Sequence, residues 1–218
     1  MADWDKTDLL NRVKRDGRIP ATTAFPADAD IYAWLTRAEA LWKPRICSVY
    51  PYFMFEAPTL MTSSDSGVTY VFASEAAPLA VEVYPALIGE PLVCGQFGDT
   101  SADYVWEGSK IRMPGNIARV FANGPYGRWV EAPGTIDAST DSTILPAGAR
   151  QLLVDQALIY WSRAMPGLDP QRFLDQLDET WASVELSLKQ ANIKYGDAAN
   201  RQRAKVSGLA YLHARYGG

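Results

Sequence analysis

The chain has 218 residues, of which 48% are hydrophobic and 21% are charged, a balance that supports a packed core and argues against general disorder. Its formal net charge is −4, but residues 189–218 hold six basic residues and one acid, which leaves −9 on residues 1–188. No apolar run approaches the roughly 20 residues of a membrane span, and the first residues lack the pattern of a signal peptide, so we expect a protein made in the cytoplasm with no membrane partner.

Two helices are predicted in the first 44 residues. The first follows Asp3 or Asp5 as its N-cap and is short. The second carries apolar residues at helical spacing from Ile31 to Trp42. We expect it to end at Pro44, because proline interrupts the hydrogen bonds of a helix.

The pattern changes between residues 59 and 141, where short β-prone runs alternate with turn residues. Regular spacing of such runs is typical of a small antiparallel sandwich or barrel. Because helices are predicted on both sides, we expect this region to be an insertion into a helical bundle. The predicted strands cover residues 68–72, 80–84, 104–106, 110–113, 118–121 and 128–130.

Two long helices are predicted after the β-rich region. The first begins near Pro146, and the second begins at Pro170 with Asp169 as its N-cap. From Leu177 to Leu188 the apolar residues of the second helix recur at steps of four, three and four. Such a seam needs a partner helix, either in the same chain or in another subunit.

Residues 197–218 combine positive charges with apolar side chains. We expect little intrinsic structure here, and two interpretations stay open: plain terminal disorder, or a docking tail that becomes ordered on binding a partner. The docking interpretation assigns partner contacts to Arg201, Arg203, Lys205, Leu209, Tyr211, Leu212, Arg215 and Tyr216.

The residues on which many catalytic and metal sites depend are scarce in this chain. Its single histidine is His213, whereas catalytic triads and histidine-ligated zinc sites require positioned imidazoles. Cys47 and Cys94 lie far apart in the sequence, and we interpret both as reduced, buried thiols. We therefore expect no enzymatic activity, no metal and no cofactor.

Two alternatives from other functional classes stay open. The first is a hydrolase that uses carboxylates of the β-rich region, for which the candidates are Glu82, Asp99, Asp103 and Glu107. We interpret these acids instead as solvated surface charges, because charged side chains are mostly exposed. The second alternative is a nucleic-acid-binding module that uses the basic C-terminal segment.

The order of the predicted elements resembles that of the head-to-tail connector, or adaptor, proteins of tailed bacteriophages. Three stretches carry the resemblance, namely 141–146 (DSTILP), 152–161 (LLVDQALIYW) and 169–173 (DPQRF). The expected fold class is α+β. It consists of a helical bundle formed by residues 1–58 and 142–196, an antiparallel β-rich insertion at 59–141, and an extended C-terminal docking tail at 197–218.

The resemblance implies a structural virion protein, located in the neck between head and tail. In that family, subunits form a twelve-membered ring under the portal, and DNA passes through the lumen. The implied partners are the portal protein, neighbouring copies in a homo-dodecameric ring and tail or nozzle proteins, with genome DNA passing without specific binding. An acidic body suits this passage, because like charges repel. Another virion completion or stopper protein is the alternative within this class.

Overall fold

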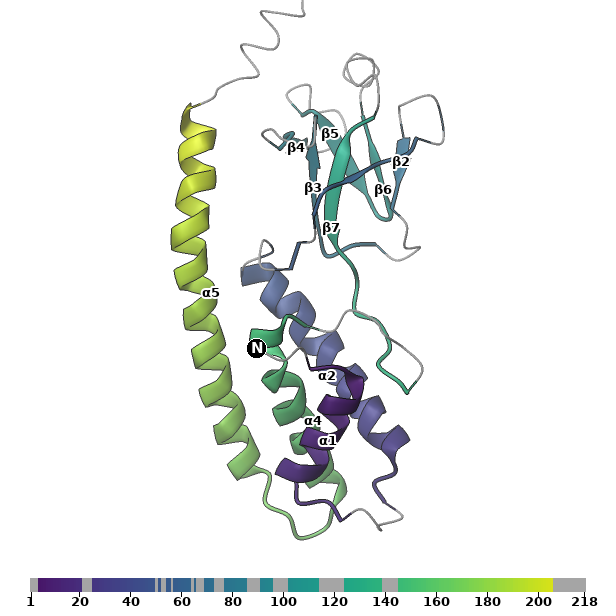
Figure 1. Cartoon of the computed structure of the whole chain (residues 1–218), viewed down its shortest axis with the longest axis vertical. Helices are drawn as coiled ribbons and strands as arrows, with labels where there is room; N and C mark the ends of the chain where they lie inside the picture. The colour runs from purple at the N-terminus through teal and green to yellow at the C-terminus, as the bar shows by residue number, and fades with distance from the viewer. Residues whose placement is uncertain are drawn as a thin grey trace, which may run out of the picture. The chain divides into compact units, whose positions relative to one another are not determined.

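The chain folds into helices and β-strands, which confirms the coarse prediction of a mixed α+β protein (Figure 1). In this computed structural model, the chain divides into a helical unit, Met1–Met54 with Ala132–Leu188, and a β unit, Phe55–Glu131 with Lys189–Gly218. The structure describes residues 4–20, 25–49, 51, 54–55, 57–63, 65, 69–72, 77–85, 91–95, 102–113, 124–138 and 145–205, without the side chains of 147 and 191–205.

Helix α1 (Lys6–Asp16) begins at the N-cap Asp5, one of the two residues predicted for this role. The Oδ1 atom of Asp5 accepts a hydrogen bond from the backbone N–H of Asp8 at 2.8 Å. In return, Oδ2 of Asp8 accepts one from the N–H of Asp5 at 3.3 Å. These contacts satisfy two N–H groups that the start of a helix leaves without partners. The buried residues of α1 are Leu9, Leu10 and Val13.

Helix α2 (Asp28–Val49) is longer than predicted, because it continues through Pro44. A proline removes one helical hydrogen bond and crowds the carbonyl group four residues earlier. Beyond it, Ile46 and Cys47 are buried in the same core as Trp42. Their burial offsets the local loss, so the prediction of a helix end at Pro44 is wrong.

Helix α4 (Gln151–Ala164) forms the centre of the helical unit. It follows a short 3₁₀ helix, η2 (Ala147–Ala149), close to the predicted start at Pro146. Every residue from Leu152 to Ile159 is buried. A helix that is buried on all sides must be surrounded by other elements, and α4 contacts both α1 and α2.

Helix α5 (Gln171–Lys205) packs its seam within the chain. Its start is fixed by Asp169, whose Oδ1 accepts a hydrogen bond from the N–H of Gln171 at 2.8 Å, as the predicted cap requires. Trp181 packs against Trp42 of α2 with ring centroids 5.1 Å apart. One partner of the seam is therefore a helix of the same chain. The buried seam residues are Leu177, Val184 and Leu188.

The C-terminal part of α5 differs from the predicted tail. The helix continues through Gly196 to Lys205, whereas little intrinsic structure is predicted for residues 197–218. Residues 197–205 contain alanine, arginine, glutamine and lysine, which all have high helix propensity, so a helix that is already nucleated extends through them. The prediction is therefore wrong for residues 197–205, and residues 206–218 lie outside the described part.

The described strands of the β unit form two sheets and no closed barrel. One sheet has the order β1-β7-β3, and the other has the order β2-β6-β5-β4. All pairs are antiparallel as predicted except β4 with β5, which run parallel. The predicted strand at 118–121 lies outside the described residues. The strands are β1 (Thr59–Leu60), β2 (Thr69–Val71), β3 (Ala80–Tyr84), β4 (Cys94–Gly95), β5 (Tyr104–Glu107), β6 (Lys110–Arg112) and β7 (Tyr126–Val130).

Side chains from both sheets contribute to one hydrophobic cluster in the β unit. Gly127 of β7 lies beside it, and a Cβ atom there would come within 2.4 Å of the Sδ of Met61, so the methionine side chain would have to shift. The buried members of the cluster are Met61, Tyr70, Phe72, Val83, Tyr104, Ile111 and Met113.

Residues 132–138 belong to the helical unit, although the predicted β-rich insertion includes them. The Oγ1 of Thr36 in α2 donates a hydrogen bond to the carbonyl oxygen of Ile136 at 3.1 Å and accepts one from its N–H at 2.9 Å. The side chain of Ile136 is 2% exposed. This non-local contact assigns the segment after β7 to the helical core.

Candidate functional site

The structure places only part of the predicted docking tail. Arg201, Arg203 and Lys205 lie at the C-terminal end of α5. The other five residues predicted for partner contacts lie outside the described part of the chain. They are Leu209, Tyr211, Leu212, Arg215 and Tyr216.

Helix α5 carries charges of opposite sign in its two halves. Its first half presents the exposed acids Asp175, Asp178 and Glu179. From residue 189 to residue 205 the helix has five basic residues and one acid. The backbone carbonyl groups give the C-terminal end of a helix a partial negative charge, so basic residues are stabilising there. The basic segment is therefore compatible with the helix that carries it.

A buried carboxylate holds the first half of α5 to α4. The side chain of Asp155 is fully buried, and its Oδ1 accepts hydrogen bonds from Gln151 Nε2 at 2.8 Å and from Gln176 Nε2 at 2.7 Å. Its Oδ2 accepts one from Thr180 Oγ1 at 2.7 Å. Burial raises the pKa of Asp155, while the three donors lower it. Since two of these donors belong to α5, the network fixes the position of that helix along α4.

Aromatic and basic side chains add a second contact between α2 and α5. The guanidinium carbon of Arg45 lies 4.2 Å from the ring centroid of Trp181 and 4.9 Å from that of Trp42. A cation this close to two indole rings is attracted to their electron-rich faces. Arg45 therefore closes over the tryptophan pair, and the first half of α5 is held both to α2 and to α4.

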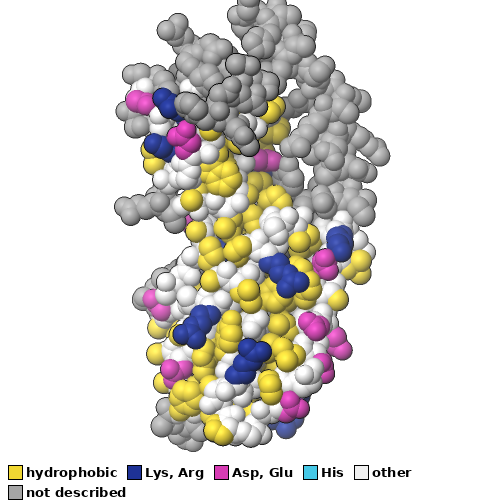
Figure 2. All heavy atoms as spheres, turned by 180° about the vertical axis from the view of Figure 1, so that it is seen from behind, with side chains coloured by type: hydrophobic (Ala, Val, Ile, Leu, Met, Phe, Trp, Pro, Cys, Tyr) yellow, Lys and Arg dark blue, Asp and Glu magenta, His cyan; other side chains and the backbone are white. Residues whose placement is uncertain are grey.

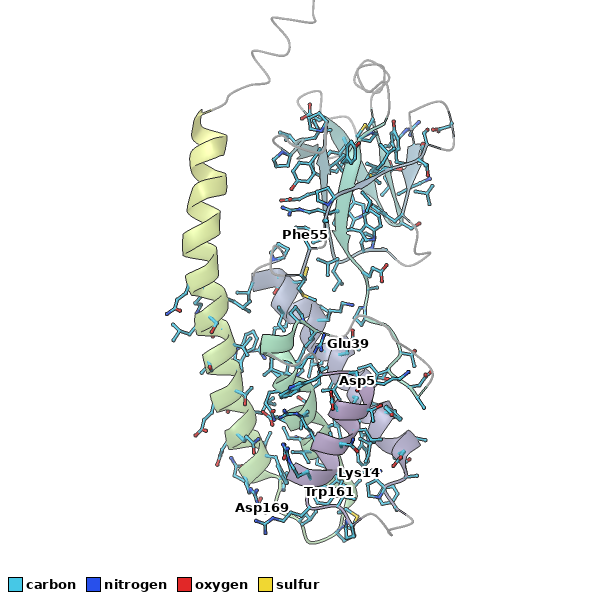
Figure 3. All side chains as sticks on the ribbon, in the orientation of Figure 1. Asp5, Lys14, Glu39, Phe55, Trp161 and Asp169 are labelled. Atoms are coloured by element: carbon cyan, nitrogen blue, oxygen red, sulfur yellow. The ribbon has the colours of Figure 1, made fainter. Side chains whose placement is uncertain are left out.

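A second buried acid lies within α2. Figure 3 labels Glu39, whose side chain is 1% exposed and whose Oε1 lies 3.4 Å from the Nζ of Lys43, one helical turn later. Burial raises the pKa of Glu39, and the nearby ammonium group of Lys43 lowers it. This pair is a structural feature of the helical core, and it lies on a different helix from the predicted docking residues.

Two of the acids proposed for a hydrolase have hydrogen-bond partners in the β unit. Glu82 of β3 accepts hydrogen bonds from Arg128 of β7 at 2.6 and 2.9 Å, and Asp103 accepts one from the N–H of Val93 at 2.8 Å. Glu107 ends β5, and Asp99 lies outside the described residues. Because Glu82 and Asp103 are largely buried, their interpretation as solvated surface charges is wrong.

The ion pair in the β unit has an aromatic environment. The guanidinium carbon of Arg128 lies 4.7 Å from the ring centroid of Phe55 and 5.4 Å from that of Tyr84. Tyr84 also donates a hydrogen bond from its hydroxyl to Oε2 of Glu82 at 2.5 Å. Glu82 and Tyr84 lie on β3 and Arg128 lies on β7, so these contacts join the two strands.

The cysteines differ in their surroundings. Cys47 is buried, and burial raises the pKa of its thiol, whereas Cys94 in β4 is exposed. The prediction that both thiols are buried is therefore wrong for Cys94. In the part of the chain that the structure describes, no three histidine, cysteine or acidic side chains are grouped as metal ligands. No described helix is both long enough and apolar enough to cross a membrane.

Sequence reasoning missed Asp155 and Glu39 as important positions. A signal was present in both cases, because each is an isolated acid inside a strongly apolar helical run. A charged residue on the apolar side of a helix must either be paired or shift its pKa. The pattern indicated a buried polar contact, but it did not identify Gln176 and Thr180, two of the donors to Asp155, because they lie on a different helix.

Comparisons with known proteins identify no family for this chain. No protein-family model matches it, and no curated protein is significantly similar to it.

Proposed function

We propose that the chain is a structural subunit of a tailed bacteriophage, a head-to-tail connector located in the neck between head and tail. Copies form a ring under the portal, which is dodecameric as the resemblance implies. The subunit holds the portal on one side and tail or nozzle proteins on the other. It is a helical bundle with a β-rich, sandwich-like insertion, and genome DNA passes through the ring without specific binding.

This proposal rests on a difference between the two halves of α5. Its first half is fixed to α4 through Asp155 and to α2 through the tryptophan pair, and its second half continues as a basic helix. A long helix that is anchored at one end can present charged residues to a partner with little loss of conformational entropy. Such an arm is suited to joining two large assemblies.

Charge supports the same proposal. Residues 1–188 carry −9, so a channel lined by copies of this part would repel the phosphates of passing DNA. The basic segment requires a partner with acidic surface, and the portal protein is the partner in this proposal. The apolar residues between 206 and 218 then add contacts that salt does not screen.

The proposal is tested by two truncations of the full-length protein. A chain that ends after Lys205 keeps the helix and loses the apolar residues of 206–218 together with Arg215, whereas a chain that ends after Gly196 also loses Arg201, Arg203 and Lys205. We expect both to remain folded and both to lose portal binding in negative-stain images of the mixed proteins. In complementation, both give DNA-filled heads without tails. Normal virion yield from the shorter chain would contradict the docking role.

The same truncated proteins distinguish the connector from the main competing function, which is nucleic-acid binding. Five basic residues on one helical segment are a specific reason to test it. Binding of the full chain to duplex DNA at physiological salt, lost on truncation after Gly196, would favour the nucleic-acid-binding module. The connector proposal predicts no such binding. It also predicts that Arg201→Glu with Arg203→Glu weakens portal binding most at low salt, where charges are least screened.

A further inference from the structure

One stripe of α5 faces away from the core of the helical unit. Asp175, Glu179, Ser183, Leu186 and Gln190 recur about once per helical turn, and all five are exposed. Leu186 is 58% exposed, the highest value among the exposed large hydrophobic residues of the described structure. Figure 2 shows acidic side chains gathered along the edge of the helical unit on which α5 lies.

The same stripe continues to the end of the helix. At about 100° per residue, positions 194, 197, 201 and 205 fall on the face that begins with Asp175. Figure 1 shows α5 as one continuous helix, which is the condition for this register. The residues at these positions are Lys194, Asp197, Arg201 and Lys205.

The stripe is complementary to its own reversed copy. With Gln190 as the centre, Asp175 corresponds to Lys205 and Glu179 corresponds to Arg201. Ser183 then corresponds to Asp197, and Leu186 to Lys194. We propose that α5 pairs in antiparallel orientation with α5 of a second copy of this chain, about a two-fold axis at Gln190.

The antiparallel orientation follows from the charges. In a parallel pair with the same register, acids would lie beside acids and bases beside bases, and like charges at these positions repel. Antiparallel pairing places each acidic half beside a basic half and also opposes the two helix dipoles. In a two-fold contact the same surface is used on both copies, because each residue pair across the contact occurs twice. The occupant is therefore a second copy, since the complement is encoded in the same helix.

This inference goes beyond the proposed function and does not depend on it. A two-fold contact closes on itself and builds a dimer, whereas a ring requires a head-to-tail contact between neighbours. The dimer would occupy Arg201 and Lys205, two residues that the connector proposal assigns to the portal. Pairing of α5 and binding of the portal through these residues would therefore exclude each other.

The pairing is tested by disulfide trapping in the full-length protein with Cys94→Ser as background, because Cys94 is exposed and Cys47 is buried. Gln190→Cys places one thiol from each copy at the axis, and mild oxidation gives a covalent dimer on a non-reducing gel. The matched control is Glu179→Cys, which lies on the same stripe but about 33 Å from its own counterpart in an antiparallel pair. A disulfide requires Cα atoms within about 7 Å, so this control alone stays monomeric.

Mixing two single-cysteine variants tests the register of the paired α5 helices. Glu179→Cys mixed with Arg201→Cys gives a covalent dimer that neither protein forms alone. A covalent dimer from Glu179→Cys alone means parallel pairing and overturns the proposal. Failure of Gln190→Cys to cross-link overturns it as well, as does a wild-type protein that sediments as a monomer at every concentration tested.

A charge swap tests the complementarity in solution. The acidic half is reversed in Asp175→Lys with Glu179→Lys, and the basic half is reversed in Arg201→Glu with Lys205→Glu. Each double variant weakens the dimer in sedimentation velocity by about tenfold or more at low salt. An equimolar mixture of the two, or all four substitutions in one chain, restores it. Glu131→Lys, an exposed acid of the β unit, is the control for a change of charge alone. A mixture that stays monomeric overturns the proposal.

Discussion

The helical unit and the β unit accommodate charge in different ways. In the helical unit Asp155 is fully buried and Glu39 is 1% exposed, and burial raises the pKa of both. In the β unit Glu82 has a direct partner in Arg128, and the two side chains remain 12% and 23% exposed. The first arrangement keeps acids in the buried core, and the second keeps an ion pair that is partly exposed to solvent.

The difference shows how each architecture joins its elements. Strands β3 and β7 are already joined by backbone hydrogen bonds, so Glu82 and Arg128 add to a ladder that exists without them. Helices satisfy their backbone internally, and only side chains can fix one helix relative to another. Asp155 has that role, since it accepts hydrogen bonds from Gln176 and Thr180 of α5. We therefore expect substitutions of single polar residues to matter more in the helical unit.

We expect the largest change in stability when the β-rich region is deleted from the helical unit. Replacing residues 55–131 with a short Gly/Ser linker keeps Ile136 and its contacts with Thr36, so we expect a helical protein that unfolds cooperatively. Replacing residues 59–141 removes Ile136, and we expect a loss of roughly 3 kcal/mol or more relative to the first variant. Circular dichroism during urea titration measures both. Equal stability of the two variants would contradict the assignment of residues 132–138 to the helical core.

A truncation in the core of the helical unit is expected to have the next largest effect. Leu158 of α4 is completely buried, so Leu158→Ala leaves a cavity and lowers the free energy of unfolding by about 2–5 kcal/mol. The matched control is Leu41→Ala on the exposed side of α2, where we expect a change within about 0.5 kcal/mol. Chemical denaturation gives both values, and similar losses at the two positions would contradict the assigned faces.

Removing the buried carboxylate tests the link between α4 and α5. Asp155→Ala leaves three donors without their acceptor, and we expect a loss of about 2–3 kcal/mol. Asp155→Asn keeps an acceptor oxygen for the two glutamines and an amide for Thr180. We therefore expect it to lower the free energy of unfolding less than Asp155→Ala does.

The pH dependence of these variants has a definite sign. The pKa of Asp155 is higher in the folded protein than in the unfolded chain, so the folded state binds the proton more tightly. The contribution of this group to stability is therefore present at low pH and is lost as the pH rises through the folded pKa. Relative to wild type, Asp155→Asn becomes more stable in urea titrations as the pH is raised from about 4, the pKa of an aspartate in an unfolded chain, towards neutrality. A difference that stays constant over this range would exclude a raised pKa.

The smallest effect is expected in the β unit. Glu82→Gln removes the charge and keeps acceptor and donor groups beside Arg128, and we expect a loss of about 1 kcal/mol or less, because the pair is partly exposed. A double-mutant cycle with Arg128→Lys measures the coupling free energy. A coupling larger than that of Asp155 with Thr180 would reverse the comparison between the units.

Much of the fold follows from local patterns in the sequence. Asp5 and Asp169 cap the helices for which they were predicted, and the seam from Leu177 to Leu188 packs as its spacing indicates. The strands at 80–84, 104–107 and 110–112 also lie where the alternation of β-prone runs and turns places them. These features depend on neighbours within about one helical turn or one strand, and such information is contained in a short stretch of sequence.

Only the tertiary structure decided the features that depend on distant residues. The helix continues through Pro44 because Ile46 and Cys47 are buried by other elements, and β4 runs parallel to β5 although its own sequence has no signal for direction. Glu82 and Asp103 look like surface acids in the sequence, but Glu82 is largely buried beside Arg128, and Asp103 is buried and accepts a hydrogen bond from the N–H of Val93. In each case the stabilising partner lies on a different element, so no local pattern could predict the outcome.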